Sequence, residues 1–258
     1  MKLQLLSDLH LESERFIPVP APGAELLVLA GDIDARWRSL ARFAQWPVPV
    51  LFVPGNHEFD GRELRAALPA LRVHCRSLGI RLLHRESVVL GGADGVPVRF
   101  VGVVRWSDYE LFGAAARPRA MRAAAHFLRL MAASCEGRPF GPEAVRAEGL
   151  ADRAWLEAEL AQPSHGRWAR TVAITHFAPS ARSADPRFGA QPTTASFCNA
   201  DEDLIVRADL WLHGHLHCRH DYGIARAARA PARVVCQARG LQRKGEAQGH
   251  DPMRLIEA

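Results

Sequence analysis

The chain has 258 residues, of which 48% are hydrophobic and 24% charged, a composition that excludes a disordered chain, a coiled coil and a collagen-like repeat. The net charge is +5, but the basic residues are dispersed, which excludes a dedicated nucleic-acid-binding tail. No apolar run approaches the roughly 20 residues that span a bilayer, and Ser7-Asp8 ends the apolar start too early for a signal peptide. The five cysteines include no C-x-x-C pair, so we expect free thiols and a cytoplasmic protein with no membrane segment.

The chain predicts short buried strands that alternate with helices, as in α/β proteins. Residues 3–6, 26–30 and 48–53 are apolar runs that lead directly into polar loops, as buried strands do. Apolar residues at helical spacing predict helices at 36–46 and 62–78. Further strands are expected at 82–90, 98–104, 171–175, 210–212 and 233–237.

Two segments in the second half differ from this pattern. Residues 117–160 are predicted to form a helical insertion within a single domain of residues 1–258, with a break at 137–142. An apolar stripe on its first half is expected either to pack on the body of the protein or to cap a site. Residues 177–199 contain three prolines and little periodicity, and irregular loops of this length are usually functional. We therefore expect both segments to flank a functional cleft.

Five short motifs rich in Asp and His follow the predicted strands. The carboxyl ends of strands in an α/β sheet form its binding edge, so the motifs are expected to converge there. Their two Asp, one Asn and four His give a mixed oxygen and nitrogen ligand set, which suits Mn²⁺, Fe or Zn²⁺ better than a Cys-rich zinc site would. The motifs are Asp8-Leu9-His10, Gly31-Asp32, Gly55-Asn56-His57-Glu58, Thr175-His176 and Gly214-His215-Leu216-His217.

The spacing of residues within these motifs has a physical explanation. In Asp8-x-His10 and His215-x-His217, the i,i+2 spacing is expected to place both side chains on one side of an extended segment. A glycine precedes three of the polar residues, and glycine permits tight turns and close backbone approach.

The ordered series D-x-H, G-D, G-N-H-E, H and G-H-x-H resembles the calcineurin-like metallophosphoesterase superfamily, and in particular a bacterial branch without an assigned substrate. The resemblance extends from Asp8 to His217 and implies a four-layer α/β/β/α sandwich of two mixed sheets flanked by helices, with two metal ions between the sheets. It implies that His57 lies outside the metal ligands and acts on the substrate as a general acid or electrostatic stabiliser. It also implies one metal held by Asp8, His10, Asp32 and His217, and a second held by Asn56, His176, His215 and the bridging Asp32.

Three positions depart from the superfamily pattern. Ala35 stands where a carboxylate is often found, with Asp34 one residue early, so the partner that orients His57 is left open. Phe177 follows His176, where many relatives have a second His. Residues 237–240 read Q-A-R-G in place of N-P-R-G, a change expected to alter the rim of the site.

The charge of such a centre indicates its chemistry. Two divalent ions contribute +4 and Asp8 and Asp32 contribute −2, so the centre would carry about +2, attract a phosphate and lower the pKa of a bridging water. We therefore expect a binuclear metal-dependent phosphoric ester hydrolase, a phosphatase or phosphodiesterase, with a metal-bridging hydroxide as nucleophile. Its cofactors would be two divalent ions, with Mn²⁺ favoured over Fe and Zn²⁺. A small phosphoester substrate and no obligate protein partner are expected.

Two alternatives stay open at this point: a metal-dependent nuclease, with nucleic acid as the partner, and a non-catalytic binding module on the same scaffold. The residues that bind the substrate are unknown from the sequence. Arg105, Arg182, Arg187 and Arg239 are candidate phosphate clamps, because Arg binds phosphate through two parallel hydrogen bonds. His213 precedes the last motif and is expected to pack in the core.

Overall fold

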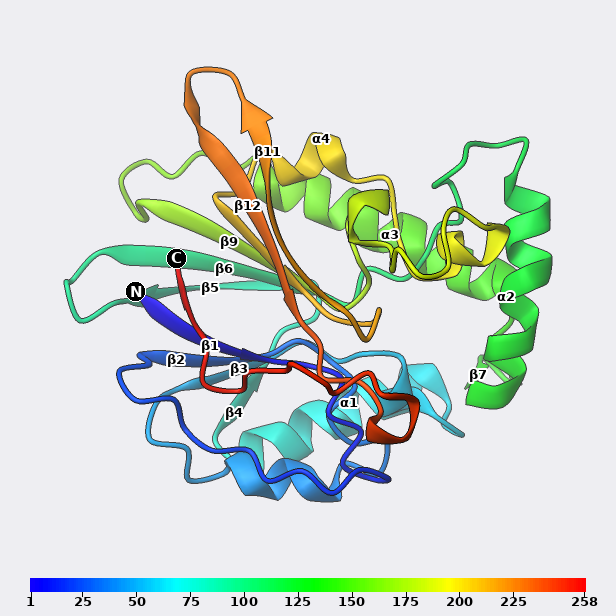
Figure 1. Ribbon diagram of the computed structural model, residues 1–258, viewed down its shortest axis with the longest axis horizontal. Coiled ribbons are helices and arrows are strands. Elements are labelled where there is room, and N and C mark those ends of the chain that lie inside the picture. Colours follow the sequence, from blue (N-terminus) through cyan, green and yellow to red (C-terminus); the bar gives the residue numbers. More distant parts are fainter.

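The computed structural model describes residues 1–258, and most of its strands belong to two sheets that pack against each other (Figure 1). The first sheet has the order β13-β1-β2-β3-β4, in which β1 to β4 are parallel and β13 is antiparallel to β1. The bounds of its strands are Lys2–Leu6 (β1), Leu26–Leu29 (β2), Val50–Phe52 (β3), Ile80–Leu82 (β4) and Leu255–Glu257 (β13).

The second sheet has the order β11-β12-β10-β9-β6-β5. Its four central strands, β12, β10, β9 and β6, are parallel, and an antiparallel strand lies at each edge. The bounds of its strands are Glu86–Gly91 (β5), Pro97–Val103 (β6), Arg170–Thr175 (β9), Leu210–His213 (β10), Arg219–Arg226 (β11) and Arg229–Gln237 (β12).

Alternate residues of the strands face either the space between the sheets or an outer helical layer. Leu5 and Val28 of the first sheet pack with Phe100 and Ile174 of the second in one buried cluster. The outer face of the first sheet is covered by α1 (Leu64–Ser77), and that of the second by α3 (Pro142–Leu160) and α4 (Glu202–Ile205) (Figure 1). The four-layer α/β/β/α sandwich of two mixed sheets is therefore confirmed.

The segment at 117–160 contains two helices with different roles. Its second helix, α3, packs on the second sheet, whereas α2 (Arg117–Met131) lies at one end of the molecule (Figure 1). The predicted break forms a small hairpin of β7 (Ser134–Cys135) and β8 (Arg138–Pro139), with Gly137 at positive φ in its turn. No helix combines the length and the apolar content that a membrane span requires.

Some predicted elements differ from the structure in type or extent. Residues 36–46 contain only a 3₁₀ helix, Arg38–Phe43, and residues 82–90 divide between β4 and β5, which belong to different sheets. Strands β11 and β13 were not predicted, because β11 is a polar edge strand and β13 has only three residues.

Candidate metal centre

The five motifs converge at the carboxyl ends of β1, β2, β3, β9 and β10, as predicted. Their potential metal-ligating atoms form three overlapping groups. Within each group, these atoms lie within 4.8 Å of one another. One group contains Asp8, His10 and His217, and another contains Asp32, His176 and His215. The third joins His10 and Asp32 with His57. Asp32 thus belongs to the second group and, through the third, lies within 4.8 Å of His10 of the first group.

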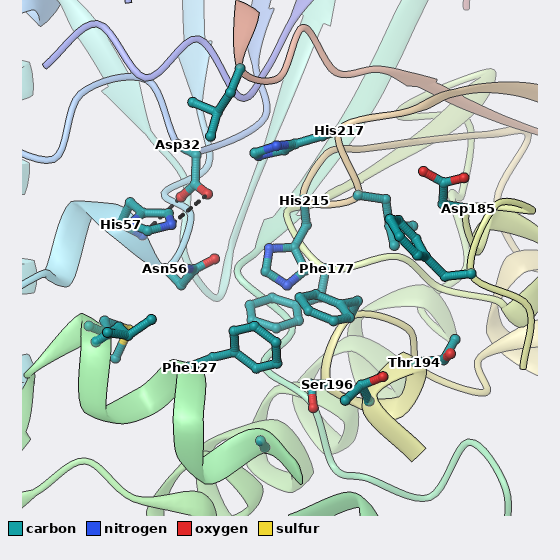
Figure 2. Close-up of a pocket in the computed structure, with 18 of the residues that line it drawn as sticks. Asp32, Asn56, His57, Phe127, Phe177, Asp185, Thr194, Ser196, His215 and His217 are labelled. Atoms are coloured by element: carbon teal, nitrogen blue, oxygen red, sulfur yellow. Dashed lines mark hydrogen bonds and ion pairs between the residues drawn. The ribbon is translucent and has the colours of Figure 1, made fainter. Parts of the chain in front are cut away.

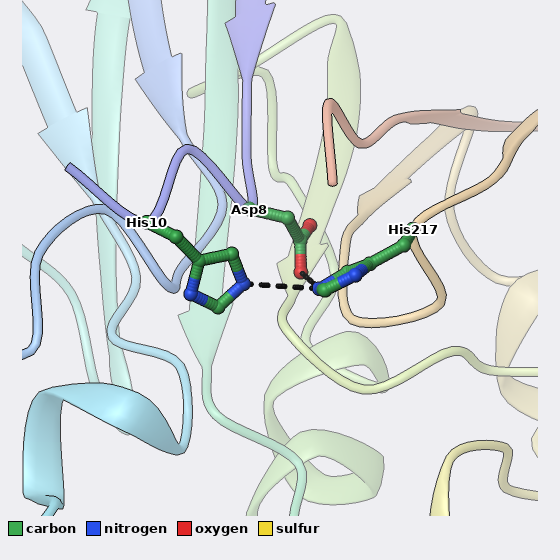
Figure 3. A group of neighbouring side chains, drawn as sticks. All are labelled: Asp8, His10 and His217. Carbon is green, nitrogen blue, oxygen red and sulfur yellow. Dashed lines mark hydrogen bonds and ion pairs between the residues drawn. The ribbon is translucent and has the colours of Figure 1, made fainter. Parts of the chain in front are cut away.

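Three acceptor atoms face one another in the first group (Figure 3). His217 Nδ1 lies 2.7 Å from Glu246 and His10 Nδ1 lies 3.3 Å from Glu12, and a carboxylate only accepts, so both protons sit on Nδ1 in the neutral rings. Each Nε2 then offers a lone pair. The two Nε2 atoms are 3.0 Å apart, and His217 Nε2 is 3.5 Å from Asp8 Oδ1, a repulsive arrangement that a cation relieves.

The second group has the same character. His176 Nδ1 donates to the carbonyl oxygen of Ala30 at 2.8 Å, so in the neutral ring Nε2 is an acceptor. That Nε2 lies 3.1 Å from Asn56 Oδ1, 3.3 Å from Asp32 Oδ2 and 3.1 Å from His215 Nδ1. The other ring nitrogen of His215 is buried without a hydrogen-bond partner. The atoms that converge on His176 Nε2 fit a bound divalent cation, which would be ligated by His215 through Nδ1.

The negative charge of Asp32 also shifts the pKa of the adjacent His176. Burial lowers the pKa of His176, but the adjacent Asp32 carboxylate outweighs burial and raises it to about 9. The same ion pair holds the pKa of Asp32 well below its usual range, although burial opposes it. Positive charge is therefore stabilised where the second cation would bind.

Backbone strain concentrates in the same loops. Five of the proposed ligands have positive φ without being glycine: Asp8 (54°), His10 (46°), Asp32 (54°), His215 (75°) and His217 (51°). This region costs non-glycine residues free energy, and such outliers cluster at functional sites. The prediction that the i,i+2 pairs lie on extended segments was wrong: left-handed turns aim these side chains at the centre.

Glycines let these loops approach one another closely. A Cβ on Gly31 would lie 2.2 Å from His176 Nδ1, and a Cβ on Gly55 would lie 2.2 Å from Asp32 Oδ1. A Cβ on Gly214 would lie 2.6 Å from Asp8 Oδ2. No other residue fits at these positions without displacing a proposed ligand, so the role predicted for these glycines agrees with the structure.

Glu58 fixes the relative position of two of the loops. It is fully buried, and its carboxylate accepts N–H bonds from Asp32, Ile33 and Asp34 after β2 and from Gly55 after β3, at 2.6–3.2 Å. The sequence motif contains Glu58, but its role depends on contacts between loops that the motif does not reveal.

Asp60 is the carboxylate partner of His57 that the sequence left open. His57 Nδ1 lies 2.7 Å from Asp60 Oδ2, and His57 Nε2 points toward the centre, 4.0 Å from Asp32 Oδ2. Asp34 does not take this role, because its carboxylate accepts the backbone N–H groups of Arg36 and Ser39. Burial lowers the pKa of His57, but Asp32 and Asp60 outweigh burial and raise it to about 10, so the ring carries a proton on each nitrogen at neutral pH.

The centre opens into a cavity of about 670 Å³ (Figure 2). Phe127, Leu128 and Met131 of α2 line it, and so do Phe177 and Phe197 of the segment 177–199. The prediction that both segments flank the cleft is confirmed. The apolar stripe of α2 serves both expected purposes, because Ala124 and Met131 line the cavity and are also buried in a core cluster.

Of the four arginines considered as phosphate clamps, one lines the cavity and three do not. Arg187 lines the cavity, paired with Asp185, whereas Arg105, Arg182 and Arg239 are not among its lining residues. Arg105 is buried and pairs with Asp108 and Asp201; Arg182 lies over the Tyr222 ring; Arg239 pairs with Glu14. Sequence reasoning missed Arg243 and Lys244, which also line the cavity.

Other sequence expectations concern residues near the centre. His213 is buried beside Ser183, and all five cysteines are free, as predicted. In the altered Q-A-R-G segment, the N–H groups of Arg239 and Gly240 donate to the carbonyls of Ser7 and Asp8. The segment therefore joins the two sheets beside a proposed ligand.

Two solved structures have similar folds. A phosphopantetheinyl hydrolase from Mycobacterium tuberculosis is 22% identical, with a TM-score of 0.69 over 99% of this chain and 95% of that chain. A dimetal phosphatase from Danio rerio is 13% identical, with a TM-score of 0.50 over 91% of this chain and 86% of that chain. Neither a family model nor a curated protein matches the amino-acid sequence. The likeness confirms the calcineurin-like metallophosphoesterase fold that the motifs predicted.

Proposed function

We propose that this protein is a binuclear metal-dependent phosphoric ester hydrolase. The observation that carries the proposal is the convergence of acceptor atoms in two neighbouring groups, Asp8 with His10 and His217, and Asp32 with His176 and His215, which a third group links through His10 and Asp32. One cation would be held by Asp8, His10, Asp32 and His217, and the other by Asp32, Asn56, His176 and His215. Mn²⁺ is the first ion to test, with Fe and Zn²⁺ next, because the ligands combine carboxylate, amide and imidazole donors.

Bound cations would supply positive charge to neutralise a phosphoester and would lower the pKa of a water molecule. Around them, Glu12 and Glu246 hold protons on the Nδ1 atoms of His10 and His217, which directs each Nε2 to the centre. Asp60 positions His57 in the same way. Asp32 accepts the backbone N–H of His57 at 2.9 Å, and this hydrogen bond fixes the position of His57 relative to the proposed ligand Asp32.

His57 is the proposed catalytic acid. Its Nε2–H points toward the space between the metal-binding groups, where the leaving oxygen of an ester would gain negative charge (Figure 2). Proton donation from such a group typically contributes roughly 10²–10⁴ in rate. The presence of this positioned acid beside a complete ligand set favours an enzyme over a non-catalytic binding module.

A screen of the Mn²⁺-loaded protein tests the proposal. The substrates are nitrophenyl and alkyl phosphomonoesters, phosphodiesters, a phosphopantetheinyl ester and single-stranded DNA. The phosphopantetheinyl ester is included because of the name of the Mycobacterium tuberculosis protein. We expect Mn²⁺-dependent release of phosphate or alcohol from small esters. Cleavage of DNA alone would favour the nuclease alternative.

Two variants make the screen specific. Asp32→Asn removes the shared charge and is expected to abolish hydrolysis. Asp34→Asn is the matched control, because Asp34 is also buried but its carboxylate binds only backbone N–H groups of the loop. Equal loss in both variants, or no cleavage of any ester by protein that binds two Mn²⁺ ions, would overturn the proposed function.

A further inference from the structure

A row of aromatic rings leads away from the metal centre along one side of the cavity. The rings of Phe177 and Phe197 pack on His215, with centroids 4.1 and 5.1 Å away. Phe127 of α2 continues the row, 5.4 Å from Phe197. Figure 2 shows Phe127 and Phe177 on the same side of His215. We call Phe127, Phe177 and Phe197 the aromatic wall.

The surface that α2 presents to the cavity is entirely apolar. The lining residues from this helix are Ala124, Phe127, Leu128, Leu130 and Met131, and none of its arginines is among them. Phe127 is 42% exposed and Leu130 is 71% exposed. Large apolar side chains left exposed together commonly mark a binding surface. Because they border the same cavity as His57 and His215, they are placed to contact whatever binds at the centre.

Charged side chains lie on other parts of the cavity lining. The basic residues Arg187, Arg243 and Lys244 and the acidic residues Glu12, Asp32, Asp185 and Glu246 all come from segments outside α2. A molecule that fills the cavity would therefore place its charged group at the centre, where the cations of the proposed function would bind an anion, and an uncharged group against α2. A polynucleotide carries a charge at every residue and gains no phosphate contact from such a wall.

We propose that the aromatic wall is the subsite for the organic group of the phosphoester, and that this group is an uncharged apolar alcohol or phenol. The proposal rests on the proposed function, because the centre must hold the phosphate end of the same molecule. Apolar ligand cavities with a few convergent polar groups have the size observed here. The wall determines which esters are good substrates, whereas the centre determines the reaction.

An alkyl phosphate series from ethyl to hexyl tests the subsite in the Mn²⁺-loaded protein. The alcohols of this series are leaving groups of nearly equal quality, so changes in kcat/KM report contacts with the chain. Full burial of one methylene corresponds to a roughly fourfold change in kcat/KM. Burial on one side gives about half of that free energy, which corresponds to an increase of about twofold. A rise of about 16-fold from ethyl to hexyl is therefore expected. A series with no dependence on chain length would overturn the subsite.

Phe127→Ala locates the effect. This variant should lower the hexyl-to-ethyl ratio of kcat/KM about fivefold, since one ring of the wall is removed. The matched control is Phe112→Ala: Phe112 is 40% exposed, close to the 42% of Phe127, but it does not line the cavity. The control should keep the wild-type ratio. Equal ratios in both variants would contradict the assignment to the wall.

Binding of alkylphosphonates separates this inference from the proposed function. These compounds contain no ester bond, so their affinity, measured by calorimetry, does not require turnover. Affinity that rises from ethyl- to hexylphosphonate and weakens in Phe127→Ala supports the subsite even if no ester is cleaved, an outcome that would defeat only the proposed function. Affinity independent of chain length overturns the subsite. A wild-type dimer that Phe127→Ala dissociates, with no chain-length effect, would instead assign the wall to a second copy of the chain.

Discussion

Asp60 is expected to control the protonation of His57 without being essential for hydrolysis. The change Asp60→Asn keeps an oxygen in place to accept the His57 Nδ1–H but removes the negative charge; in the wild type, Nδ1 lies 2.7 Å from Asp60 Oδ2. A hydrogen bond to a charged group contributes about 1.5–3 kcal/mol and a neutral one about 0.5–1.5 kcal/mol, so corresponding ends of the two ranges differ by about 1–1.5 kcal/mol.

Solvent reduces this difference, because the side chains are 40% (His57) and 31% (Asp60) exposed. We take about 1 kcal/mol, which corresponds to a rate loss of about fivefold if the charge of His57 stabilises the leaving oxygen. His57→Asn removes the proton donor itself and should slow alkyl ester hydrolysis by roughly 10²–10⁴. Both effects should be smaller for nitrophenyl esters, whose leaving groups need no proton.

The assay compares kcat for an alkyl and a nitrophenyl ester in wild type, Asp60→Asn and His57→Asn, with metal content and melting temperature as controls. All three proteins should bind two metal ions. If His57→Asn turned over the alkyl ester at a near-normal rate with both metals bound, His57 would not be the acid. A loss in Asp60→Asn as large as that in His57→Asn would contradict a purely positioning role for Asp60.

Three further outcomes follow from the geometry. Asp32→Ala should lose both metal ions and Asn56→Ala mainly one, as measured by elemental analysis; two ions in purified Asp32→Ala would reject the bridging role. Gly31 has a φ of 91°, and Gly31→Ala would place a Cβ within 2.2 Å of a proposed histidine ligand. The variant should lower the free energy of unfolding by at least about 2 kcal/mol and weaken metal binding. Gly79→Ala, at φ 72° with no atom nearby, should cost only about 1 kcal/mol and leave metal binding unchanged. Burial lowers the pKa of His84 to about 3, so the stability from its neutral form is complete above its unfolded pKa of about 6.5 and is lost as pH falls. Between about pH 7.5 and 5, the free energy of unfolding measured with urea should fall by about 2 kcal/mol because of this group, and His84→Asn should not show this decrease. Equal decreases in both proteins would refute the role of His84.

The sequence revealed the metal-binding motifs because each combines an apolar strand with a polar turn, two local patterns. Strands β1, β2 and β9 were predicted on this basis together with the residues that follow them. Strands β11 and β13 were missed because their pairing partners lie elsewhere in the chain and their own sequences are polar or short.

The residues that the sequence did not reveal act through a local turn or through contacts between distant segments. Asp60 reaches His57 because residues 57–59 form a 3₁₀ turn, a local conformation that the motif letters do not specify. Glu246 lies 29 residues after His217, so only the folded chain shows their contact. Phe127 contacts Phe197 only after α2 has packed beside the irregular segment 177–199.

A titration of the metal-free protein with Mn²⁺ tests the central claim most directly. Bound metal and hydrolysis of a nitrophenyl phosphate ester are followed in the same samples. We predict that two ions bind per chain and that hydrolysis rises with occupancy of the complete pair. Hydrolysis that persists in the presence of a chelator, or saturation at a single ion with full activity, would contradict a binuclear centre that shares Asp32.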